Sequence, residues 1–137
     1  MIFEESPDVF WQRFSEYAIT GEILPVPYGY PLLEVITTIG AVYAFDRGAP
    51  PAPTGFQEVL FAGAVKSFKN NNEPKGMQQI KGGYSILKGK VLRELEDETY
   101  LFDVGILIIL NSEEPLQVGV SLEVVIEPPL MIFRKEV

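Results

Sequence analysis

The clearest pattern along the chain is an alternation of apolar and polar residues near its C-terminal end. The apolar set, all on one parity, is Leu116, Val118, Val120, Leu122, Val124 and Ile126. A period of two is typical of a strand with one buried and one hydrated face. We therefore expect a strand over 116–126. Pro128 and Pro129 should interrupt the backbone hydrogen bonding of this strand, and 130–133 should follow as a short edge strand.

Similar patterns predict the earlier strands. The segment 32–45 is rich in β-branched and aromatic residues and reads as one long strand that bends at Gly40, while 56–68 is apolar on both parities. The segments 84–95 and 99–110 read as a hairpin that turns through three acidic residues at 96–98. Proline-rich stretches at 24–31 and 46–55 and a polar stretch at 70–76 are expected to be loops.

One helix is expected near the N-terminus. Ser6 can cap it, and Pro7 suits the first helical position. Phe10, Phe14 and Tyr17 then share one face, and Thr20-Gly21 is the expected end of the helix. This aromatic stripe predicts a helix that packs on a sheet rather than a cofactor site.

These elements predict a mainly β (α+β) fold in one domain spanning 1–137. The expected architecture is an antiparallel sheet, or a small partly open barrel, of five to six strands with the N-terminal helix packed on it. Strand edges attract further strands. If 116–126 or 130–133 forms an edge, self-association through it is a hypothesis.

Composition limits the chemistry. The chain has 137 residues, of which 47% are hydrophobic and 22% charged, as in folded globular proteins, and it contains neither histidine nor cysteine. The commonest general base and the thiol nucleophile are therefore missing, and no catalytic or metal-binding motif is present. We expect a non-enzymatic protein without cofactor or metal. With no export signal and no apolar run longer than 106–110, we also expect a cytoplasmic protein without membrane association.

Charge is distributed unevenly. The formal net charge is −8, yet the segment 66–93 alone carries +6. One interpretation is a hydrated, lysine-rich hairpin. The other is an OB-like groove for single-stranded nucleic acid, with cations beside aromatic stacking platforms. Its candidate residues are Lys66, Lys69, Lys81, Lys88, Lys90 and Arg93, with Phe68 and Tyr84 interleaved.

One acid is singled out by its neighbours. Asp103 lies within the apolar segment 99–110, where desolvation would raise its pKa and could create a ligand pocket or a carboxylate-based active site. The alternative is a position on the hydrated face beside Gly105.

The sequence favours a binding or assembly module that acts through protein–protein contacts, with another protein or with a second copy. Two alternatives stay open. One is the single-stranded nucleic-acid binder, and the other is a small-ligand barrel or carboxylate enzyme.

Overall fold

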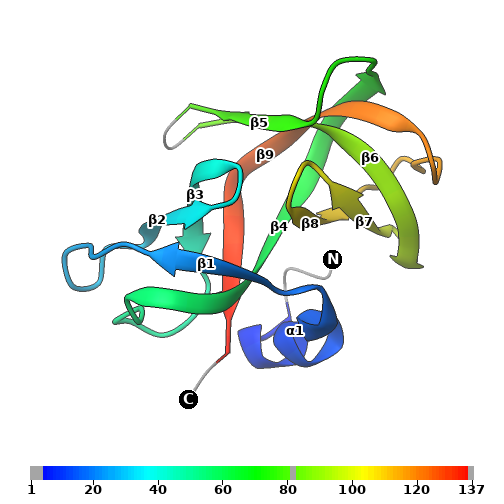
Figure 1. Cartoon of the computed structure of the whole chain (residues 1–137). Coiled ribbons are helices and arrows are strands. Elements are labelled where there is room, and N and C mark those ends of the chain that lie inside the picture. The colour runs from blue at the N-terminus through cyan, green and yellow to red at the C-terminus, as the bar shows by residue number, and fades with distance from the viewer. Residues whose placement is uncertain (1–4, 81–82, 136–137) are drawn as a thin grey trace.

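The computed structural model describes residues 5–80 and 83–135, which form mainly β structure with one short helix (Figure 1). The helix α1 spans Pro7–Phe14, and a 3-10 turn follows at Ser15–Tyr17. The strands are β1 (Ile19–Ile23), β2 (Leu32–Thr37), β3 (Gly40–Asp46), β4 (Gly55–Asn70), β5 (Gly76–Gln79), β6 (Ser85–Glu96), β7 (Thr99–Asp103), β8 (Leu107–Asn111) and β9 (Ser121–Arg134).

The strands pair into one mixed sheet that closes on itself twice. Its order is β1-β2-β3-β9-β4-β8-β7-β6-β5, and β1–β4 and β9–β6 pair as well. The first ring is therefore β1, β2, β3, β9 and β4, and the second ring is β4, β8, β7, β6 and β9. The β3–β9 and β4–β8 pairings are parallel. The expectation of five to six antiparallel strands was wrong, because the described residues form nine strands in mixed orientation.

The long strands β4 and β9 belong to both rings. Their register shifts between Ala62 and Ala64, where the pairing passes from the first ring to the second. Gly63 lies at this crossing, and a Cβ atom there would lie 2.7 Å from Ile126 Cγ2. Pro128 and Pro129 occupy the same region of β9, between its pairing with β6, which ends at Ile126, and its pairing with β3, which begins at Met131. The two rings thus meet where the strands approach closely.

A continuous cluster of buried side chains fills both rings. A second cluster lies outside them, where α1 packs against β9 and its neighbours (Figure 1). There the Phe10 ring stacks on Phe133 with centroids 3.9 Å apart. Leu60 and Ala62 of β4 belong to this outer cluster, while Val59 and Phe61 face the rings, so both faces of β4 are covered as expected. The prediction of a helix packed on the sheet is confirmed.

Two segments that were each expected to form a single strand form hairpins instead. The segment 32–45 reverses at 38–39, where the Thr37 hydroxyl donates to Gly40 O and accepts from Ile39 N, and Gly40 has φ +106°. The segment 99–110 divides into β7 and β8 at Gly105, which has φ +107°. Both turns are short and lie among β-branched or apolar residues, so the hydrophobic pattern did not reveal them.

Other boundaries also differ from expectation. The strand predicted over 116–126 begins at Ser121 and continues through Pro128-Pro129 to Arg134. It pairs with β4 on one side and with β6 and then β3 on the other, so neither 116–126 nor 130–133 is a sheet edge. The helix ends at Phe14, and Thr20-Gly21 lies inside β1. The sequence showed neither β1 nor β5, because both are short and neither has more than two large apolar residues.

Candidate functional site

The basic segment is divided among separate places on the surface. Lys69 of β4 and Lys88 of β6 both lie opposite Glu123 of β9, at 3.4 and 3.9 Å between the charged atoms. Lys88 Nζ also donates to Glu73 Oε2 at 2.7 Å, and this hydrogen bond lowers the pKa of Glu73 and raises that of Lys88. These cations therefore form a row of alternating charges across three strands.

One candidate aromatic residue of this segment, Tyr84, is engaged by a lysine. Lys66 Nζ donates to the Tyr84 hydroxyl and lies 4.3 Å from the centroid of its ring. Arg93 makes the corresponding contacts with Tyr17, beside α1. Lys66 and Phe68 line one hollow, whereas Arg93 lines another and Lys88 a third. Lys90 lies exposed on β6. Lys81 lies outside the described residues. Nucleic-acid binding by this segment stays a prediction.

Asp103 lies at the surface end of β7. Its carboxylate accepts a hydrogen bond from Lys75 Nζ at 2.6 Å and another from Gly105 N at 2.8 Å. Partial burial opposes ionisation, but the Lys75 hydrogen bond, the Gly105 amide and the Lys75 charge together lower the pKa of Asp103. The expected rise in this pKa was therefore wrong, and the residue occupies the hydrated position beside Gly105. A ligand-binding role for Asp103 stays a prediction.

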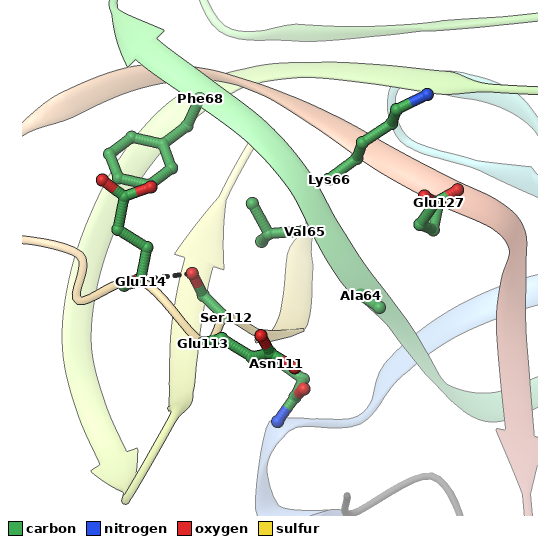
Figure 2. Close-up of a pocket in the computed structure, with 9 residues that line it drawn as sticks. All are labelled: Ala64, Val65, Lys66, Phe68, Asn111, Ser112, Glu113, Glu114 and Glu127. Atoms are coloured by element: carbon green, nitrogen blue, oxygen red, sulfur yellow. Dashed lines mark hydrogen bonds between the residues drawn. The ribbon is translucent and has the colours of Figure 1, made fainter.

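A hollow of about 390 Å³ opens at the surface of the second ring where β4 and β8 separate (Figure 2). The two strands pair from Phe61 to Ala64, after which β4 continues alone on that side and the chain leaves β8 in a turn. The lining residues are Ala64, Val65, Lys66, Phe68, Asn111, Ser112, Glu113, Glu114 and Glu127.

The polar atoms at the base of this hollow are held by the turn after β8. Asn111 and Ser112 are buried, and Ser112 N and Asn111 Nδ2 both donate to Glu98 O. The Ser112 hydroxyl donates to Glu114 O, as Figure 2 shows. The turn is thereby fixed, while the Glu113 and Glu114 side chains stay exposed. This hollow has no signature in the sequence, because it depends on where two distant strands separate.

Two proline-rich loops of the first ring enclose another hollow, of about 210 Å³. We call the prolines and tyrosines of its lining the aromatic–proline surface: Pro25, Pro27, Tyr28, Tyr30, Pro50 and Pro51. Tyr30 N donates to Pro27 O, and Gly29 has φ +76°, as the third position of a type II turn requires. This turn carries Tyr28 outward, 81% exposed, with Tyr30 at 48%.

A buried ion pair fixes the second of these loops to β9. Arg134 donates to both carboxylate oxygens of Asp46, at 3.1 and 3.0 Å, and to Ala49 O at 2.5 Å. The two side chains are only 5% and 7% exposed. Asp46 Oδ1 also accepts from Gly48 N. The backbone that carries Pro50 and Pro51 is therefore attached to the core of the first ring.

No protein-family model matches the chain, and no curated protein or solved structure matches it. Within residues 5–80 and 83–135, no group of three or more Asp or Glu side chains is placed to hold a metal ion. The described helix is too short and too polar to cross a membrane.

Proposed function

We propose that this protein is a non-enzymatic binding or assembly module that acts through contacts with another protein. The observation that carries the proposal is the aromatic–proline surface, where two tyrosines project from a glycine turn, beside a second loop that a buried ion pair holds in place. Tyrosine supplies a large contact area at a small cost in conformational entropy, and it is frequent among the residues that dominate protein–protein affinity.

Further exposed apolar side chains surround the first ring. Phe56, which follows the second loop, is 74% exposed, and Ile36 is 37% exposed. Both lie opposite Glu22 of β1 in the strand register, so they flank this acid on the outer face of the ring. Isolated exposed apolar residues are ordinary, but several near one structured hollow favour an interaction surface. The filled interior of both rings agrees with recognition on the outside.

The proposal is tested with the purified full chain and an extract of its host. Native mass spectrometry and light scattering should show a complex with a partner. The double variant Tyr28→Ser and Tyr30→Ser should lose that complex while keeping its circular-dichroism spectrum.

The matched control is Leu92→Ser with Val118→Ser, which changes two residues that are 39% and 50% exposed on the second ring. This control should retain the partner. A wild-type chain that stays free and monomeric at every concentration would contradict the proposal, and so would equal losses in both double variants.

A further inference from the structure

The strand β4 has an unpaired edge beside the hollow of Figure 2. On one side it pairs with β9 as far as Asn70. On the other side it pairs with β1 over 55–59 and with β8 over 61–64. No described strand pairs with residues 65–70 on that side. Main-chain groups at such an edge are available to an additional strand.

Across the hollow from this edge of β4 lies a second wall, formed by the chain that follows β8. The chain after β8 supplies Ser112, Glu113 and Glu114, and Val65 points into the space between the two walls in Figure 2. Phe68 is half-buried beside the same space and packs on the core of the second ring. A strand placed along 65–70 would cover about 20 Å, at roughly 3.3 Å per residue. Five or six residues of extended chain are therefore the right length.

The charge of the residues that line the hollow indicates which kind of segment would bind there. Glu113 and Glu114 are exposed, and neither forms an ion pair with any residue in the described ranges. Glu127 adds a third carboxylate to the lining. The single cation among the lining residues, Lys66, donates to Tyr84 and is attracted by Glu127, so it offsets only one of the three negative charges. The walls thus offer apolar contacts from Val65 and Phe68 and an uncompensated negative charge beside them.

We propose that this groove binds an extended segment of a partner protein in which apolar residues alternate with lysine or arginine. The segment adds to β4 at 65–70 through main-chain hydrogen bonds. Its apolar side chains contact Val65 and Phe68, and its basic side chains face Glu113 and Glu114. This inference rests on the proposed function, since it assigns a second contact and a partner chemistry to the same module, on a surface separate from the tyrosines.

The test uses a fluorescein-labelled peptide of alternating valine and lysine, titrated against the full chain by fluorescence anisotropy. Three comparison peptides share its length: one with glutamate in place of lysine, one with the same residues in two blocks, and one with alternate backbone nitrogens methylated. The protein variants are E113K/E114K and a control with the same change in charge, E16K/E58K, at two exposed acids outside the groove.

Wild type and E16K/E58K should bind the alternating peptide with similar affinity, and E113K/E114K should bind at least about tenfold more weakly. The three comparison peptides should bind weakly. Hydrogen exchange should slow at residues 65–70 when the alternating peptide is present. The proposal would be overturned if both protein variants lost the same affinity for the alternating peptide, or if affinity did not depend on the peptide pattern and on N-methylation. Either result would show attraction to net charge alone.

Concentration-dependent dimerisation that E113K/E114K abolishes would also overturn it, because a second copy would then occupy the groove. Failure here can be separated from failure of the proposed function. A host partner that depends on Tyr28 and Tyr30 but not on Glu113 and Glu114 would preserve the function and remove the groove from it.

Discussion

Replacing Arg134 by methionine tests the importance of the buried ion pair directly. The guanidinium and the Asp46 carboxylate meet through two hydrogen bonds at 3.1 and 3.0 Å, and their side chains are 5% and 7% exposed. Methionine can fill much of the arginine volume, but it leaves a carboxylate in a site that water barely reaches. Ala49 O also loses its hydrogen bond from Arg134.

Removing one member of a buried pair typically costs about 3–5 kcal/mol of folding free energy. With a denaturant slope of about 2 kcal/mol per molar urea, this moves the unfolding midpoint down by about 2 M. Equilibrium unfolding in urea measures the change, with the fluorescence of Trp11, the single tryptophan, and circular dichroism as independent signals. The double variant D46N/R134M should recover about 1–3 kcal/mol, because an amide is cheaper to bury than a charge and can still accept from Gly48 N.

The reasoning would be refuted if R134M were within about 1 kcal/mol of the wild type, which would mean that water or a rearrangement solvates the carboxylate at low cost. It would be refuted equally if D46N/R134M were less stable than R134M.

Three further predictions follow from other parts of the fold. Gly89→Ala should destabilise the chain by about 3 kcal/mol or more in the same urea assay, because the new Cβ atom would lie 2.1 Å from the backbone oxygen of Asp103. The control is Gly76→Ala, where the new Cβ atom would have nothing within 4 Å. This variant should stay within about 0.5 kcal/mol of the wild type. Phe10→Ala should cost about 3–5 kcal/mol of folding free energy, since this ring of α1 is fully buried against the sheet. A loss below about 1 kcal/mol would show that the packing of the helix contributes little to stability. Asp103→Asn should cost at most about 1 kcal/mol at pH 7, because the contact with Lys75 is partly exposed. Because the pKa of Asp103 is lowered in the folded state, its carboxylate contributes stability above the unfolded pKa of 3.8, and this contribution is lost as the pH falls through the folded pKa. In urea titrations from about pH 7 to about pH 2, the free energies of unfolding of the wild type and Asp103→Asn should therefore converge at acid pH.

Local signals in the sequence predicted those elements that local chemistry determines. The helix begins at Pro7 with Ser6 as its cap, as expected, because capping depends on neighbouring residues alone. The alternation Leu122, Val124, Ile126 also holds, with all three residues buried in the second ring. The pattern predicted that these residues share a face, but it could not predict where β9 begins or that it runs past two prolines.

What sequence reasoning missed depends on contacts between distant residues. The pKa of Asp103 follows from Lys75, 28 positions away, and Glu123 separates two lysines only because β9 lies between β4 and β6. The hollow at the surface of the second ring and the aromatic–proline surface depend in the same way on which strands diverge and which loops meet. Charge and hydrophobicity along the chain give no information about these pairings.

The sharing of β4 and β9 by both rings has a consequence during synthesis on the ribosome. The first ring contains β1, β2 and β3, which emerge early, yet its closure requires Met131 to Arg134, which emerge after the rest of the described strands. Until then β3 and the first half of β4 lack their β9 partner, so the nascent chain exposes strand edges that the finished fold covers. Chaperone binding to the growing chain is therefore expected to persist until β9 has left the exit tunnel. Truncation within β9 is expected to prevent both rings from closing.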